Sequence, residues 1–113
     1  MTEVTFAPSA NIDVIAALTA IQNYFLQKES PELAKSHIAL FEAELKGAEK
    51  RLAEYPEFYS VREEYSGNRY GRQYRTFNFH WFIAFYTYTL SEGVFIWHIR
   101  SSRSDYSDIA AHF

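Results

Sequence analysis

Apolar residues recur every three or four positions between residues 31 and 55. Because three to four residues make one helical turn, this spacing predicts an amphipathic helix with one apolar face. Ser30 and Pro31 suit the first turn of this helix, and Pro56 marks its end. The apolar positions are Ala34, Ile38, Phe41, Leu45, Ala48, Leu52 and Tyr55.

A similar pattern precedes it and predicts a first helix that ends near Lys28. Ser9 or Asn11 is suited to cap this helix, and Asp13 would lie in its first turn. Since only a few residues separate the two helices, they are expected to form an antiparallel hairpin. The apolar positions of the first helix are Val14, Leu18, Ile21 and Phe25.

The pattern changes after residue 79, where apolar residues occupy both alternating positions of the run His80–Leu90. A strand that is apolar on both faces is typical of the middle of a sheet. Ser91, Glu92 and Gly93 form a turn-like connection, which predicts an antiparallel hairpin with the next strand. In that strand, Val94–Arg100, strict alternation places one set of side chains on the core face and the other set opposite. The core set is Phe95, Trp97 and Ile99, and the opposite set is Val94, Ile96, His98 and Arg100.

Two further strands complete the predicted sheet. Glu3–Ala7 is a short candidate at the N-terminus, and Arg69–Phe77 alternates with polar side chains on both faces, as near an edge. After Arg103 the chain is expected either to form a short helical turn or to fray. The predicted fold is one α+β domain over residues 1–113, with a short N-terminal strand, a helical hairpin and a three-stranded antiparallel sheet portion.

Composition narrows the functional classes. The chain has no cysteine, so disulfides and zinc–thiolate sites are excluded. Its apolar runs are shorter than the roughly 18 residues of a transmembrane helix, and its start has no signal-peptide pattern. A cytoplasmic protein without membrane contact is therefore expected.

Charge is distributed unevenly along the chain, whose formal net charge is −3. Residues 1–57 hold nine acidic and five basic residues, whereas residues 58–113 hold five acidic residues and six arginines. Because arginine is preferred where planar groups or phosphates are bound, the second half is expected to contact an anionic partner. The arginines are Arg62, Arg69, Arg72, Arg75, Arg100 and Arg103.

Four segments together resemble the RelE/ParE superfamily, the bacterial toxins of type II toxin–antitoxin modules. They are VTFAPSANID near the start, LAEYP at the end of the second helix, FIAFYTYT with its Tyr86, and VFIWHIRSSRSDY. The resemblance implies a short first strand, a helical hairpin and an antiparallel sheet. It also implies a growth-inhibiting toxin that a cognate antitoxin neutralises.

The family divides into two mechanisms, and the resemblance leaves both open. RelE-like members cut messenger RNA on the ribosome, whereas ParE-like members inhibit DNA gyrase and cut nothing. The acidic net charge and the long second helix favour the ParE type, because phosphate contacts dominate nucleic-acid affinity. In contrast, a C-terminal polar set resembles that of a ribonuclease; its members are His98, Arg100, Arg103 and Tyr106.

Cleavage of RNA by the 2′-hydroxyl would require a base, a cation at the phosphate and an acid. His98 or His80 could serve as base or acid, since alternation places His98 and Arg100 on one face of their strand. Tyr106 or Tyr86 could stack on a base or donate a proton. The candidate phosphate-binding residues are Arg75, Arg100 and Arg103.

Each candidate also has a purely structural interpretation. His98 beside Trp97 is compatible with packing, Tyr86 with the core, and Arg100 and Arg103 with an acidic partner helix of the antitoxin. No metal site and no cofactor are expected. A non-toxic binding module or a decayed toxin is the alternative function. The predicted binding residues are Arg69, Arg72, Arg75, His80, Arg100 and Arg103.

Overall fold

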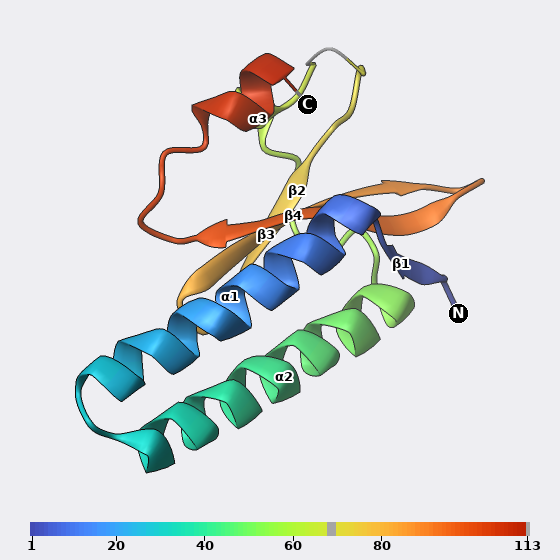
Figure 1. The fold of residues 1–113 in the computed structure, drawn as a ribbon. Helices are drawn as coiled ribbons and strands as arrows, with labels where there is room; N and C mark the ends of the chain where they lie inside the picture. The colour runs from blue at the N-terminus through green and yellow to red at the C-terminus, as the bar shows by residue number, and fades with distance from the viewer. Residues whose placement is uncertain (68–69, 113) are drawn as a thin grey trace.

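The computed structural model describes residues 1–67 and 70–112, in which four strands and three α-helices follow one another (Figure 1). A 3₁₀ turn at Glu63–Tyr65 precedes the second strand. The elements are β1 (Val4–Phe6), α1 (Pro8–Gln27), α2 (Pro31–Glu54), β2 (Arg75–Phe79), β3 (Phe82–Thr89), β4 (Gly93–Ser101) and α3 (Ser107–His112).

The sheet has the strand order β1-β4-β3-β2 and is mixed. β2, β3 and β4 are antiparallel, as predicted, but β1 pairs in parallel with β4, so that Val4 lies opposite Val94. The prediction of a three-stranded antiparallel sheet was therefore wrong, although the α+β class is confirmed. The long-range pairing is closed by two backbone hydrogen bonds of 2.9 Å, from Val94 N to Glu3 O and from Ala7 N to Ile96 O.

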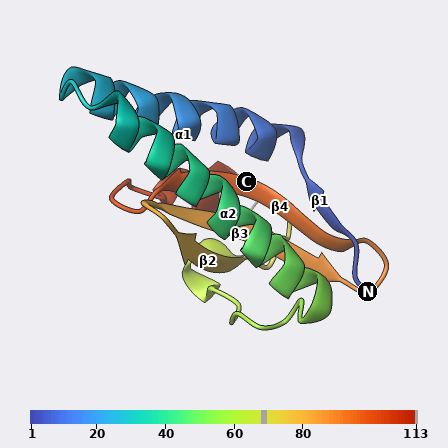
Figure 2. The same cartoon turned by 90° about the horizontal axis from the view of Figure 1, so that it is seen from below.

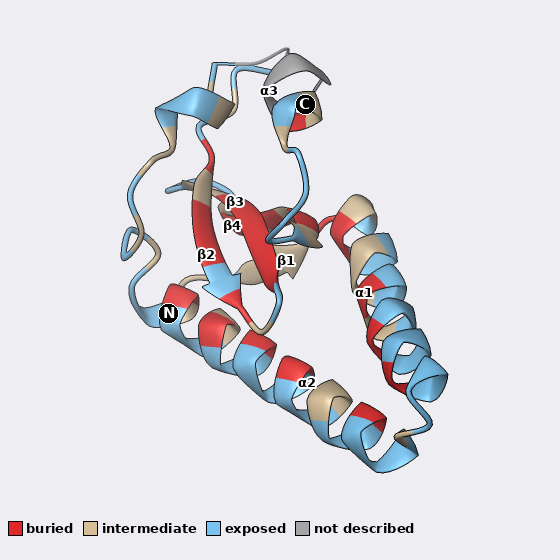
Figure 3. Ribbon diagram, turned by 90° about the vertical axis from the view of Figure 1, so that its left-hand side faces the viewer, coloured by how far each residue is buried: buried red, intermediate tan, exposed pale blue. Residues whose placement is uncertain are grey.

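The helical hairpin covers one face of the sheet, as Figures 1 and 2 show. The helices pack against each other, and Figure 3 shows that their buried residues face the sheet. No described helix is long and apolar enough to cross a membrane. The largest fully buried side chains of this core are Phe41, Tyr86, Ile21, Leu52 and Ile96.

The start of α1 differs from the prediction because its polar side chains bind β4 instead of capping the helix. The helix begins at Pro8, and Ala7 at its N-cap makes no side-chain cap hydrogen bond. Ser9 donates to the carbonyl of Trp97 at 2.6 Å, and the Asp13 carboxylate accepts from the amide of Ile99 at 2.9 Å. These two bonds fix α1 on β4.

A smaller apolar cluster covers the second face of the sheet. Its buried members are Tyr74, Ile83, Phe85 and Ile109, the last of which belongs to α3. The short helical turn predicted after Arg103 thus exists as α3, and it packs on this face.

A β-bulge in β4 changes which side chains share a face. Phe85 lies opposite His98 and Tyr86 lies opposite Ile96, so Trp97 is the extra residue. Ile96 and Ile99 both belong to the helix-side core, whereas Trp97 packs against the cluster on the second face. The predicted core face of Phe95, Trp97 and Ile99 was wrong for this reason, because alternation assumes an unbroken strand.

Two strand boundaries also differ from the prediction. β2 begins at Arg75 rather than at residue 69, because Gly71 at φ +66° turns the chain out of an extended path. β3 begins at Phe82, since His80 and Trp81 form the two-residue turn between β2 and β3. Arg69 lies outside the described residues.

Candidate functional site

His98, a candidate for the catalytic base or acid, is buried. Its side chain is 2% exposed and its ring lies 6.1 Å from that of Tyr74. Burial, and then the charges of Arg100 and Arg72, lower the pKa of His98 to about 4. A group with this pKa is neutral at pH 7 and has no proton to donate as a general acid, and it is also a weak base. Neither its basicity nor its access therefore suits general-base catalysis.

Arg100, the predicted phosphate ligand, is engaged by carboxylates. Its Nη1 lies 2.9 Å and 3.2 Å from the two carboxylate oxygens of Asp108 in α3, and its Nε lies 4.0 Å from Asp13 in α1. His98 and Arg100 are on the same side of β4, as predicted. However, the guanidinium of Arg100 ties α3 to the sheet instead of being presented to a ligand.

The hydroxyl groups of the two candidate tyrosines also form hydrogen bonds within the protein. The Tyr106 hydroxyl donates to the carbonyl of Ser101 at 2.9 Å, and burial raises the pKa of Tyr106. Tyr86 is fully buried, its hydroxyl donates to Pro56 O at 3.1 Å, and burial raises its pKa to about 12. Tyr86 is a core residue, in agreement with the structural interpretation.

His80 and Arg103 lie apart from His98, at the end of the sheet formed by the β2–β3 turn. Both line a groove beside α1. The Nε2 atom of His80 shares a 2.8 Å hydrogen bond with Nδ1 of His37 in α2, and burial lowers the pKa of His80. Of the four predicted catalytic residues, Arg103 alone is among the residues that line this groove.

The remaining predicted binding residues, Arg72 and Arg75, take different positions. Arg75 in β2 donates to the backbone carbonyl of Tyr59. The Arg72 guanidinium lies 3.7 Å from the ring centroid of Trp97 and 4.7 Å from that of Tyr70. Arg72 thus belongs to a cation–π assembly on the second face of the sheet.

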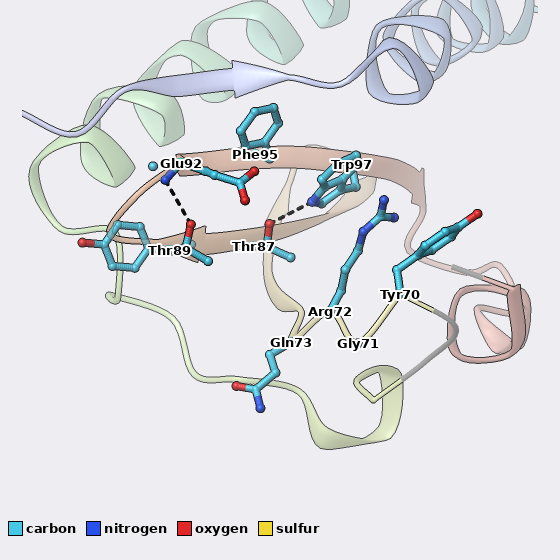
Figure 4. Close-up of a pocket in the computed structure, with 11 residues that line it drawn as sticks. Tyr70, Gly71, Arg72, Gln73, Thr87, Thr89, Glu92, Phe95 and Trp97 are labelled. Atoms are coloured by element: carbon cyan, nitrogen blue, oxygen red, sulfur yellow. Dashed lines mark hydrogen bonds between the residues drawn. The ribbon is translucent and has the colours of Figure 1, made fainter.

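This assembly lines a groove of about 570 Å³, which we call the Trp97 groove (Figure 4). In Figure 4, Arg72 extends from its loop toward Trp97 on β4. The loop, the end of β3 and the start of β4 form its walls. The lining residues are Tyr70, Gly71, Arg72, Gln73, Thr87, Tyr88, Thr89, Glu92, Gly93, Phe95 and Trp97.

Hydrogen bonds and ring stacking hold the side chains of Trp97, Phe95 and Arg72 in this groove in position. The indole Nε1 of Trp97 donates to Thr87 Oγ1 at 2.8 Å, and its ring stacks on Phe95 with centroids 5.4 Å apart. Arg72 also donates to the Tyr74 hydroxyl at 3.1 Å. Rings and guanidinium are therefore positioned before any ligand arrives, which reduces the entropy lost on binding.

The chemistry of the Trp97 groove is that of a binding surface. It offers tryptophan and tyrosine rings and one guanidinium, the residue types in which protein-binding hot spots are rich, beside threonine hydroxyls and the Glu92 carboxylate. Sequence reasoning found Arg72 but assigned Trp97 and Phe95 to the core. Alternation grouped these two rings with Ile99, and the bulge that separates them from Ile99 left no sign in the sequence pattern.

Within residues 1–67 and 70–112, no group of three or more His, Asp or Glu side chains is placed to hold a metal ion. The chain matches no protein-family model, and no curated protein matches it significantly.

Proposed function

We propose that this chain is the toxin of a type II toxin–antitoxin module, and that it inhibits growth by binding its target rather than by cutting RNA. The resemblance of its segments to the RelE/ParE superfamily supports the first part. The order of a short strand, a helical hairpin and antiparallel strands agrees with what that resemblance implies.

The observation that carries the second part is the state of His98 and Arg100. Ribonucleolytic cleavage needs a base whose pKa lies near the operating pH. It also needs a cation that is free to bind the phosphate. His98 is buried with a pKa of about 4, and Arg100 is paired with Asp108 at 2.9 Å. The acidic net charge of −3 also disfavours a ribonuclease, because it opposes binding to a polyanion.

A ParE-like inhibitor of DNA gyrase, held inactive by an antitoxin, agrees best with these features. In this proposal the Trp97 groove contacts the target. Arg72, Tyr70 and Trp97 combine the three residue types most frequent at hot spots, and they are already held in position.

The test is induction of the chain alone in a bacterial host, with growth, messenger RNA ends and gyrase supercoiling activity measured in parallel. We expect growth arrest with intact messenger RNA and inhibited supercoiling. Arg72→Ala should relieve the arrest and weaken gyrase inhibition about tenfold or more, as for a hot-spot arginine. His98→Gln should retain both effects if it folds.

Arg51→Ala is the matched control, because Arg51 also lies over an aromatic ring, that of Phe58, and donates to a tyrosine hydroxyl. It should leave toxicity unchanged. New cuts within translated codons that disappear in His98→Gln would reverse the proposal in favour of a ribonuclease. A folded chain that causes no arrest would instead indicate the non-toxic binding module.

A further inference from the structure

A second groove, of about 490 Å³, lies between α1, the β2–β3 turn and the segment after β4. We call it the Trp81 groove. Two of its aromatic side chains are well exposed, Trp81 at 39% and Tyr24 at 48%. Its lining residues are Ala20, Ile21, Tyr24, His80, Trp81, Phe82, Ser101, Ser102 and Arg103.

Trp81 is held rigidly at the surface. Its ring contacts those of Tyr24, Phe25 and His37, with centroids 5.5, 5.7 and 5.1 Å away. The ring of His80 is closer still, at 4.4 Å. A side chain packed in this way loses little further freedom when a partner covers it.

The turn that presents Trp81 is strained. His80 adopts φ +49°, in a two-residue hairpin turn where glycine or asparagine is usual. Its Nδ1 atom is buried and has no hydrogen-bond partner among the described residues. Such features cost stability, and they cluster at binding and catalytic sites.

The charge of the residues that line this groove is opposite to the net charge of residues 1–57. Residues 1–57 hold nine acidic residues against five basic ones, yet no carboxylate is among the residues that line the groove. Arg103 lines it, and Lys28 Nζ lies 5.1 Å from the ring centroid of Tyr24. Glu44 acts electrostatically on His80 but is not a lining residue. An aromatic floor thus has cations at its rim.

We infer that the Trp81 groove docks an acidic peptide segment of a partner protein, with one aromatic or large aliphatic side chain as its anchor. The anchor packs on Trp81 and Tyr24, and neighbouring carboxylates pair with Arg103 and Lys28. Trp, Tyr and Arg are the residue types that dominate binding energy at protein interfaces. The inference is independent of whether the chain is a toxin.

The test uses fluorescence anisotropy of the full chain with a labelled peptide of sequence Asp-Glu-Phe-Leu-Glu-Asp. We expect saturable binding that Arg103→Glu weakens about tenfold or more. Arg103 is exposed and follows the last strand, so this variant should fold normally, which thermal unfolding would verify. Tyr24→Ala should weaken binding as well.

Lys50→Glu provides the same change of net charge on the exposed side of α2, outside the groove, and should leave affinity within about twofold. A peptide with Ser-Gly in place of Phe-Leu should bind at least about tenfold more weakly. The inference is overturned if Arg103→Glu and Lys50→Glu have equal effects, or if the peptide without its anchor binds equally well. It is also overturned if an oligothymidylate binds in preference to the peptide, or if nothing binds at millimolar concentration.

Discussion

The extra residue in β4, Trp97, changes which side chains lie on the same face of the sheet as His98. Strict alternation correctly placed His98 and Arg100 on one side of β4, but it also placed Val94 and Ile96 with them. The bulge at Trp97 separates the two pairs, so His98 lies among Tyr74 and the second-face cluster. The sequence thus identified the residue types of a polar site. It could not indicate their burial, which depends on contacts with distant parts of the chain.

The lowered pKa of His98 predicts a loss of stability in acid. Its pKa is about 4 in the folded protein and about 6.5 when unfolded, so the unfolded state binds the proton more tightly between these values. Stability should therefore be complete above pH 6.5 and fall by about 3 kcal/mol as the pH is lowered to about 4. Urea unfolding at several pH values measures this loss.

His98→Gln supplies the comparison, because glutamine keeps polar atoms but has no proton to gain. The variant should be less stable than the parent at pH 7, and the difference between the two should shrink as the pH falls toward 4. Parallel pH profiles for the two proteins would show that other groups cause the acid sensitivity.

At the scale of elements, the helices were predicted more accurately than the strands. The second helix begins at Pro31 and ends beside Pro56, as its spacing and its flanking residues indicated. Helix signals are local, since capping, periodicity and prolines all lie within one segment. The start of β2 depends instead on Gly71 and on the loop that follows the 3₁₀ turn, so polar alternation in residues 69–77 was misleading.

Two glycines permit a matched test of element stability. Gly47 lies in α2, is exposed, and has no atom within 4 Å of the position that a Cβ would occupy. A glycine inside a helix can mark the close approach of a neighbouring helix, but α1 does not approach Gly47 in this way. Gly47→Ala should therefore stabilise the protein by about 1 kcal/mol, through helix propensity alone.

Gly93→Ala should have the opposite effect. Gly93 has φ +76°, and a Cβ at this position would lie 2.7 Å from the backbone oxygen of Glu3, at the β1–β4 pairing. We expect a loss of at least about 1–2 kcal/mol. Thermal unfolding of both variants shows whether each substitution raises or lowers the stability. A destabilised Gly47→Ala would show that α2 has a neighbour at this position.

At the scale of the molecule, the sheet is shared by two apolar clusters on its opposite faces. Neither the parallel pairing of β1 nor the two grooves could be predicted, because both depend on which distant segments meet. Trp81 and Trp97 report on different ends of this sheet, one beside the β2–β3 turn and one beside the β3–β4 hairpin.

Since both clusters depend on β3 and β4, we expect the whole domain to unfold in one cooperative step. The single-tryptophan variants Trp81→Phe and Trp97→Phe should each show one urea transition. In each variant the midpoint by fluorescence should coincide with the midpoint by far-ultraviolet circular dichroism. Midpoints that differ between the two probes of one variant would show that one end of the sheet opens first.

The parallel pairing of β1 with β4 also sets the order in which the chain can fold during its synthesis. Residues 4–6 leave the ribosome early, but their partners at 94–96 follow about 90 residues later. At about 5–20 residues per second this is a delay of roughly 5–20 s. The local contacts of the helical hairpin can form within that time, whereas the sheet cannot close. A nascent chain therefore has none of its sheet-borne grooves until β4 has been made, which gives any protective partner that recognises the hairpin time to bind first.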